Sequence, residues 1–318
     1  MTRYLARRIA QAVAVIILVT MIVFGILHFL PGSPARAMLG VKATPGAIAA
    51  FNKANGYDRA LPMQYLLYMD RLVHGNLGFS YHLDQSVGSL LALDLPKTAL
   101  LVGVSYALAI VIAIPVGLAQ ALKRNKAVDH AFTVFAFVGY SMPMFWLAML
   151  LIVLFAVQTH VLPAQAGTAA SSVGAVFNNP KVLVLPVATL TIVTVAQFSR
   201  FMRTSAIDNL LQDYIRTARA KGLSQRQLVT RHLLRNSLLP IVTLIGLSLP
   251  AVISGAIVVE AVFNYPGMGW LFWQAASTQD YPVLMGFTIV VAVATVVGNL
   301  VADVVYAVLD PRIRYSAT

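Results

Sequence analysis

The sequence predicts an all-α membrane protein with about six transmembrane helices. Hydrophobic residues make up 59% of the chain, charged residues only 11%, and the mean hydropathy is +0.78. Several apolar runs have about 20 residues, the helix length that crosses the hydrocarbon core of a bilayer. The chain has no cysteine, which excludes disulfides and thiolate metal sites. We therefore expect most of the chain to lie in lipid.

Basic residues are concentrated in a few segments between these runs. Of the 23 Lys and Arg, 16 fall in residues 3–8, 123–126, 200–235 and 312–314. The positive-inside rule places such segments in the cytoplasm, so we expect a multi-pass protein of the cytoplasmic membrane with both termini inside. The net charge of +12 then reflects topology, with anionic lipid headgroups rather than nucleic acid as its partner.

The first span is predicted at residues 9–30, directly after Arg3, Arg7 and Arg8. A cleaved signal peptide is the competing interpretation, but the apolar run is too long for the apolar region of a signal peptide. Residues 31–95 are polar, contain no run that could span a membrane, and are expected to form a small extracytoplasmic cap.

One amphipathic helix is predicted within this cap. Pro62 can open it, Gly75 can end it, and its apolar face is expected to lie on the helix bundle. That face is predicted to carry Tyr65, Leu66, Met69 and Val73.

The remaining spans are predicted at residues 98–122, 131–157, 182–201, 239–263 and 283–308. Gly139 and Pro143 are expected to bend the third of the six spans. The intervening Tyr-Ser-Met also resembles, one residue short, the nucleophile elbow of serine hydrolases. That elbow needs a strand-to-helix turn with a reachable His and acid, which a membrane helix does not supply, so we favour the bend.

The basic loop at residues 204–236 has the pattern of two short helices. Leu211, Ile215 and Ala218 form an apolar row on a helix predicted at residues 211–221, and Gly222 is placed to end it. Ser224 and Gln227 form the pattern of a capping box that opens the second helix. On charge alone, this loop could serve only to fix topology.

The residues RTARAKGL followed by RHLLRNSLLP resemble the cytoplasmic loop of inner-membrane permeases of binding-protein-dependent ABC importers, in the dipeptide, oligopeptide and nickel group. The wider family has Glu-Ala-Ala where this chain has Arg216, Thr217 and Ala218, a departure that the peptide group shares. The resemblance implies that the loop couples the permease to an ATPase. It assigns this role to Tyr214, Arg216, Thr217, Ala218, Arg219, Lys221 and Gly222.

Further stretches carry the same resemblance in the same order along the chain: LPGSPARAMLG, GYDRALPMQYLLYMDRLVHGNLGFSY, EAVFNYPGMGWLFWQAASTQDYP and DPRIRY. The resemblance implies a type I ABC importer permease fold. It also implies a second homologous permease, two ATPase subunits and an extracytoplasmic substrate-binding protein as partners.

The chain contains no phosphate-binding loop, and its histidines are scattered singly. We therefore expect no enzymatic activity, no catalytic or metal-binding residues and no bound cofactor, with ATP and Mg²⁺ in the partner ATPases. An ion-coupled secondary transporter is the alternative class, but it needs paired ionisable groups within the spans. Glu260, near the end of a span, is interpreted as a hydrogen-bonded structural carboxylate rather than a proton carrier.

Polar side chains in the later spans are expected to face the transport pathway, because unpaired polar groups are costly in hydrocarbon. These residues are Gln197, Ser199, Asn299 and Asp303. Di- or oligopeptides are the expected substrates, with nickel or another small solute as the alternative. The expected organisation is a first span at residues 1–30, the cap at 31–95, and a core of five spans at 96–315 that includes the loop at 204–236.

Overall fold

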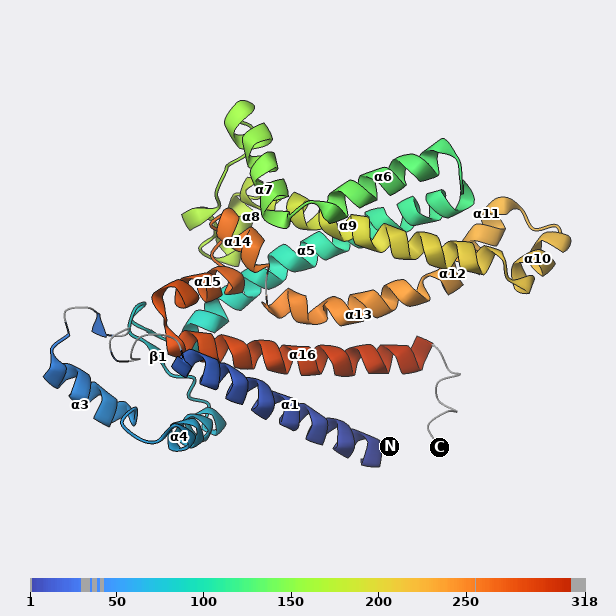
Figure 1. The fold of residues 1–318 in the computed structure, drawn as a ribbon. Coiled ribbons are helices and arrows are strands. Elements are labelled where there is room, and N and C mark those ends of the chain that lie inside the picture. Colours follow the sequence, from blue (N-terminus) through green and yellow to red (C-terminus); the bar gives the residue numbers. More distant parts are fainter. Residues whose placement is uncertain (1, 30–34, 36–38, 41–42, 255, 310–318) are drawn as a thin grey trace.

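A computed structural model describes the chain except for residues 1, 30–34, 36–38, 41–42, 255 and 310–318. The long helices α1 (Thr2–Phe29), α5 (Val87–Leu122), α9 (Lys181–Leu210), α13 (Leu239–Ser254) and α16 (Tyr281–Leu309) form one bundle (Figure 1). We call the end that carries α10 (Asp213–Ala220) the loop end. The opposite end, where α3 (Pro45–Asn55) and α4 (Leu61–Val73) lie, is the cap end. Helix α1 starts and α16 finishes toward the loop end.

Four helices are long and apolar enough to cross a bilayer. They are residues 10–29 of α1, all of α5, all of α9, and residues 281–300 of α16. Helices α5 and α9, with 36 and 30 residues, exceed the roughly 20 residues that a bilayer needs. The predicted spans at 98–122 and 182–201 therefore lie within longer helices.

The third predicted span is bent rather than straight. Helices α6 (Ala127–Ser141) and α7 (Met144–Ile152) meet at an angle of 102°, and α7 continues as the π-helix η1 (Val153–Gln158). Pro143 starts α7 and cannot continue α6, because it has no backbone N–H to donate. The bend expected in this span is thus confirmed, and it lies at Pro143, whereas Gly139 is within α6.

The fifth predicted span, residues 239–263, is divided between α13 and the short helix α14 (Ile257–Val262). By length and composition the described chain has four spanning helices, or five when α6 and α7 count as one. The six predicted spans correspond to these five and the divided α13–α14 segment. Helix α15 (Met268–Thr278) then leads back to α16.

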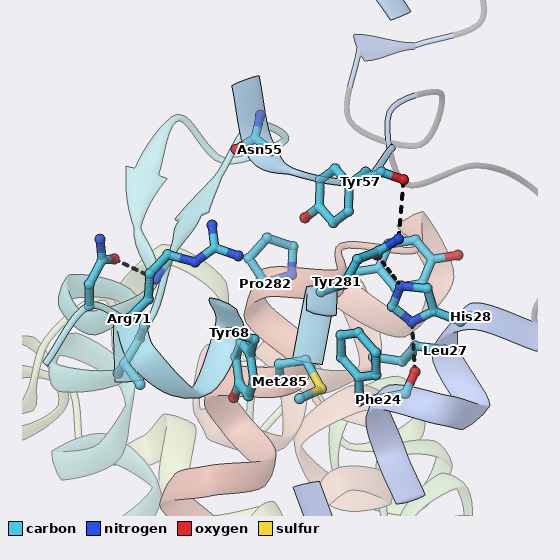
Figure 2. Close-up of a pocket in the computed structure, with 14 residues that line it drawn as sticks. Phe24, Leu27, His28, Asn55, Tyr57, Tyr68, Arg71, Tyr281, Pro282 and Met285 are labelled. Carbon is cyan, nitrogen blue, oxygen red and sulfur yellow. Dashed lines mark hydrogen bonds between the residues drawn. The ribbon is translucent and has the colours of Figure 1, made fainter. Parts of the chain in front are cut away.

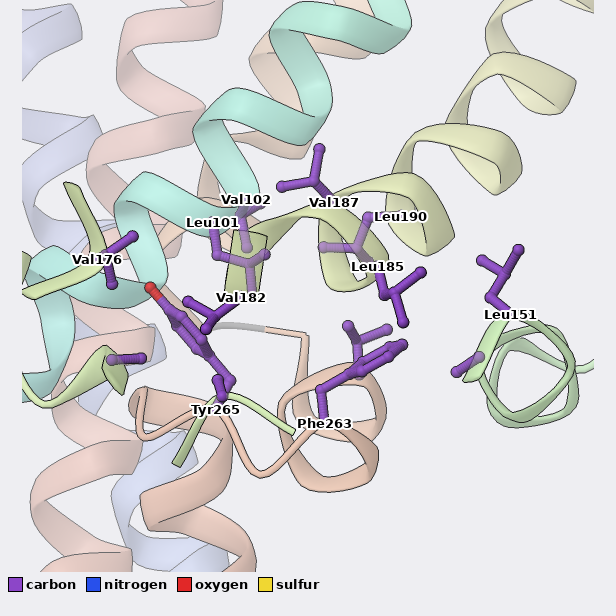
Figure 3. Packing of buried hydrophobic residues seen from close by; sticks show 14 of the residues in the cluster. Leu101, Val102, Leu151, Val176, Val182, Leu185, Val187, Leu190, Phe263 and Tyr265 are labelled. Atoms are coloured by element: carbon purple, nitrogen blue, oxygen red, sulfur yellow. The ribbon is translucent and has the colours of Figure 1, made fainter. Parts of the chain in front are cut away.

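Helices α5 and α9 form the centre of the bundle. Their backbones approach closely at Gly117, where a β-carbon would lie 2.6 Å from the Ser199 carbonyl oxygen. Toward the cap end, Leu101 of α5 and Leu185 of α9 pack with Phe263 and Tyr265, which follow α14 (Figure 3). The Tyr265 hydroxyl is buried there and donates to the Lys97 carbonyl at 2.8 Å.

The cap has the predicted helix, but only part of its predicted apolar face packs on the bundle. Helix α4 carries Pro62 in its first turn and is followed by Gly75 at φ +77°, as expected. Leu66 and Val73 of the predicted apolar face are 60% and 81% exposed, so that part of the prediction is wrong. Tyr65, a member of the same predicted face, does pack on the bundle as expected, and its hydroxyl donates to the Ile17 carbonyl of α1 at 3.1 Å.

Shorter elements complete the chain. They are β1 (Phe79–Ser80) paired antiparallel with β2 (Gln85–Ser86), η2 (Gly167–Ala170), α8 (Val173–Asn178), α11 (Gln225–Gln227), the π-helix η3 (Leu228–Leu233) and α12 (Leu234–Ser237).

Candidate functional site

Helix α10 projects from the loop end of the bundle, between the end of α9 and the helical segments α11, η3 and α12 (Figure 1). It is shorter than the predicted 211–221, because α9 continues to Leu210 and Leu211 forms its C-cap. Leu211 is 61% exposed, so its predicted place in the buried apolar row is wrong. The remainder of that row behaves as expected.

Ile215 and Ala218 are the buried side of α10, with exposed fractions of 0% and 5%. They pack with Leu228 and Leu233 of η3. Burial of an isoleucine of this kind contributes about 1.5–3 kcal/mol, enough to hold a two-turn helix on the segment that follows it. Helix α10 is thus fixed to the chain's own scaffold through its apolar side.

The turn after α10 is a complete Schellman motif. Gly222 has φ +77°, its amide donates to the Arg219 carbonyl at 3.0 Å, and the Leu223 amide donates to the Ala218 carbonyl at 3.3 Å. A β-carbon on Gly222 would meet no atom within 4 Å, so the glycine is needed for its backbone conformation and not for space. The predicted C-terminal cap is confirmed.

The predicted capping box that opens the next helix is also present. The Ser224 hydroxyl accepts from the Gln227 amide at 3.4 Å, and the Gln227 side chain accepts from the Ser224 amide at 3.1 Å. Only Leu223 separates the C-terminal cap at Gly222 from the N-terminal cap at Ser224. Together they fix the angle between α10 and η3.

The outward side of α10 is basic and exposed. Arg216, Thr217, Arg219 and Lys221 all have exposed side chains. Arg216 has one weak ion pair, in which its guanidinium lies 3.3 Å from the Asp213 carboxylate, and both side chains are more than 70% exposed. This side therefore presents positive charge and hydrogen-bond donors to whatever lies beyond the bundle.

Two of the seven predicted coupling residues face the chain itself. Ala218 is buried, and Tyr214 is half-buried with its hydroxyl donating to the Asn209 side chain at 2.7 Å. These two side chains therefore hold α10 against the rest of the chain. The other five are exposed, with Gly222 in the turn, and their contact with a partner stays a prediction: Arg216, Thr217, Arg219, Lys221 and Gly222.

An ion pair anchors α9 close to α10. Arg203 of α9 donates twice to the Asp129 carboxylate of α6, at 2.7 and 2.8 Å. The same carboxylate accepts from the Asn125 amide at 3.0 Å, which ties in the turn between α5 and α6. Bidentate charge-assisted pairs of this kind combine strength with fixed geometry. This pair was not predicted, because its members are 74 residues apart in the chain.

The predicted pathway residues do not form one cluster. Gln197 is half-buried on α9, and Ser199 is 2% exposed at the close contact between α9 and α5. Asn299 is exposed on α16, which packs against α13 and α1. The side chain of Asp303 lies outside the described residues. Their contact with a pathway stays a prediction.

Glu260 is fully buried at the cap end and is hydrogen-bonded on both oxygens. One oxygen accepts from the Thr98 hydroxyl at 2.9 Å, and the other accepts from the amides of Gly269 and Trp270 at 2.7 and 3.1 Å. The carboxylate therefore caps the first turn of α15. The interpretation of Glu260 as a hydrogen-bonded structural carboxylate is confirmed.

The Pro-Gly-x-Gly stretch at the start of α15 packs closely against this carboxylate and the backbone of α14. A β-carbon on Gly267 would lie 2.6 Å from a Glu260 oxygen, and one on Gly269 would lie 2.7 Å from the α-carbon of Ile257. Only glycine permits these approaches. Asp280 has a similar role at the start of α16, where it accepts from the Ser80 hydroxyl and from the Val283 amide.

A cavity of about 70 Å³ lies where the cap meets α1 and α16. Figure 2 shows the rings of Tyr57 and Tyr281 and the Arg71 side chain around it. Gln64 of α4 joins the cap to α1, since its amide donates to the Tyr57 carbonyl at 3.1 Å and its oxygen lies 3.1 Å from His28 Nε2. Burial raises the pKa of the Tyr57 hydroxyl. This junction holds the cap on the bundle.

Comparisons with known proteins agree along the full chain. A family described as "Binding-protein-dependent transport system inner membrane component" matches residues 113–315, and its N-terminal companion matches residues 1–102. A putative peptide permease protein of Brucella suis is 38% identical over 317 residues, 99% of both chains. The oligopeptide transport system permease protein AppB of Bacillus subtilis is 36% identical over 316 residues, 99% of this chain and all of that protein.

Among solved structures, a chain of the inward-facing MetNI methionine ABC transporter superposes with a TM-score of 0.52 at 17% identity. The match covers 70% of this chain and 96% of that chain. At this identity the likeness concerns the fold alone. It confirms the predicted type I ABC importer permease fold.

Proposed function

Because the chain belongs to the family of inner-membrane components of binding-protein-dependent transport systems, we propose that it is the permease subunit of an ATP-driven importer of di- or oligopeptides. The observation that carries the mechanism is α10, a helix with a basic exposed side that is held by its apolar side at one end of the bundle. The names of the relatives from Brucella suis and Bacillus subtilis support peptides as the substrate.

The chain is a multi-pass protein of the inner membrane and works with a substrate-binding protein and an ATPase, as its family does. The proposed complex contains a second homologous permease and two ATPase subunits. Each permease contributes one coupling helix, and each ATPase receives one. ATP and Mg²⁺ are bound by the ATPases, because this sequence has no phosphate-binding loop.

In the proposed mechanism, α10 docks in a groove of an ATPase with Arg216, Arg219 and Lys221 toward polar or acidic surface. Closure of the two ATPases on ATP draws the two coupling helices together. The fixed angle between α10 and η3, set by Gly222 and Ser224, passes this movement to α13. The pathway then opens toward the binding protein. A rigid turn is needed, because a loose one would absorb the displacement.

The proposed orientation places the loop end in the cytoplasm and the cap outside. Exposed basic residues support it, since Lys123, Arg124 and Lys126 lie in the turn between α5 and α6 at the same end as α10. The proposed units are the first span at residues 1–30, the cap at 31–95 and the core at 96–315. Gln197, Ser199, Asn299 and Asp303 stay the proposed pathway residues.

Reconstitution tests this function. The chain is co-expressed with its second permease, ATPases and binding protein, and the purified complex is placed in lipid vesicles. Peptide-loaded binding protein is expected to stimulate ATP hydrolysis and to drive uptake of labelled tripeptide. Stimulation without peptide uptake, combined with uptake of a different solute, would contradict the peptide assignment. A complex that hydrolyses no ATP in response to any loaded binding protein would contradict the importer itself.

A further inference from the structure

Helix α9 has an exposed polar row in its last four turns, toward the loop end. Arg200, Thr204 and Asp208 are exposed at successive helical turns, and Gln197 continues the row toward the cap end in a half-buried position. Their spacing of three and four residues places them on one side of the helix. Arg200 lies at the end of the span predicted at residues 182–201, and Thr204 and Asp208 follow it along the same continuous helix.

Arg200 is held by an aromatic ring. Its guanidinium carbon lies 5.1 Å from the centroid of Tyr140, a residue of α6 whose side chain is 55% exposed. Among the described residues Arg200 has no ion-pair partner, whereas Arg203, one turn away, donates from Nε and Nη2 to the two oxygens of Asp129. The two arginines therefore differ in role. One is neutralised in the bundle, and the other presents an uncompensated charge on the surface.

The guanidinium of Arg200 is directed away from the loop end. Arg203 marks that end, because its partner Asp129 is near the start of α6. Tyr140 follows Gly139, where a β-carbon would lie 3.4 Å from Ala196 of α9, one helical turn from Arg200 on the side away from Arg203. An arginine that avoids hydrocarbon by snorkelling extends toward the headgroups at its own end. Arg200 does the opposite and reaches over the ring of a residue deeper in the span.

An unpaired guanidinium in this position would be costly in contact with lipid, but it is well solvated in a water-filled pathway. A guanidinium over an aromatic face keeps its N–H edges free, and those edges match the two oxygens of a carboxylate. A single solvated contact is strong enough to attract a carboxylate and weak enough to release it, which transport requires.

We propose that Arg200, positioned by Tyr140, lines the transport pathway and binds a carboxylate of the transported solute. This inference rests on the proposed peptide import, for which the carboxylate is the C-terminal one. The row from Gln197 to Asp208 then forms the polar wall of the pathway at the loop end. No bond is made or broken, because the carboxylate passes from water to Arg200 and back to water.

The test compares two peptides in reconstituted vesicles that contain the complete complex: trialanine and its C-terminal amide. Each rate is divided by the wild-type rate for the same peptide, so preferences of the binding protein cancel. Arg200→Gln is expected to slow trialanine by roughly tenfold and its amide by about twofold or less. Arg200→Lys keeps the charge and is expected to slow trialanine less. Arg124→Gln, an exposed arginine outside the spans, is the matched control and is expected to slow neither peptide.

Equal slowing of both peptides by Arg200→Gln, or no slowing of either, would overturn the carboxylate contact. Failure of the wild-type complex to carry either peptide would instead refute peptide import, and with it a peptide carboxylate as the ligand. These two failures are distinguished by the wild-type rates.

A second measurement needs no uptake of the amide. In this cysteine-free chain, Thr204→Cys is expected to react with a water-soluble maleimide at least about tenfold faster than Val134→Cys, which is on an exposed apolar side of α6. Saturating trialanine is expected to slow the reaction at Thr204. Equal reactivity of the two positions would place the row in lipid or in a protein interface and overturn the proposal.

Discussion

Replacing Gly222 by valine is expected to uncouple ATP hydrolysis from transport while the protein still inserts and assembles. The residue sits at φ +77°, where an L-amino acid costs about 1–2 kcal/mol and a β-branched one more. That cost lowers the population of the native turn by a factor of about 5–30. No steric clash contributes, because a β-carbon there meets nothing within 4 Å.

The strain is expected to be released locally. Ile215 and Ala218 keep α10 attached to η3, so the chain as a whole has no reason to unfold. The Schellman hydrogen bonds of Gly222 and Leu223 are expected to break first. Helix α10 then loses its fixed direction relative to η3. Substrate delivery at the opposite end of the bundle is unaffected by this change.

The assay is co-purification of the ATPase, followed by binding-protein-stimulated hydrolysis and transport in vesicles. Gly222→Asn is the matched control, because asparagine tolerates the left-handed conformation and is expected to retain most of the coupling. Coupling at the wild-type level in Gly222→Val would refute the role of the turn. Equal loss in the asparagine and valine variants would show that side-chain bulk matters rather than backbone conformation.

Three further changes test other parts of the account. Single cysteines at Ser86 and Ser224 are expected to react with an impermeant reagent from outside and inside respectively, and labelling of Ser224→Cys from outside in intact cells would reverse the proposed orientation. Asp129→Ala is expected to lower stability by about 3 kcal/mol, because it leaves Arg203 without its partner. Adding Arg203→Met should recover part of that loss in thermal unfolding, and a double variant that loses the sum of both effects would argue against the pair. Glu260→Ala is expected to cost about 2–4 kcal/mol, because it strands the amides that cap α15; an unchanged unfolding temperature would contradict that cap.

Local chemistry in the loop was predictable from sequence because it depends on near neighbours. Gly222 ends α10 and Ser224 opens the next helix through contacts within five residues. The bend at Pro143 follows equally from the missing amide of one residue. Its angle does not, because the direction of α7 is set by packing on α9 and α14.

Contacts between distant segments account for the features that sequence reasoning missed. Helix α4 turns Gln64 inward because its partner, His28, lies on α1. An amphipathic pattern cannot anticipate such polar contacts, since it assigns the apolar side to the interior. Thr98, which binds Glu260 from 162 residues away, is another example.

Leu211 was misplaced for a related reason. The helical spacing of Leu211, Ile215 and Ala218 is genuine, but α9 extends through Leu210 and leaves Leu211 at its cap. The helical spacing of apolar residues can continue across the break between two helices. The side of the helix that is buried changes at that break. Boundaries between consecutive helices are therefore the weakest part of such a prediction.

Cross-linking from α10 tests the central claim most directly. Thr217→Cys, on the exposed side of α10, carries a short photo-activated cross-linker in the complete complex, and Ser89→Cys at the opposite end of the bundle is the control. The account predicts that the ATPase is captured from position 217 and not from position 89. Properly inserted complex in which position 217 captures no ATPase, in the presence or absence of ATP, would contradict the docking of α10 and leave the loop with a purely topological role.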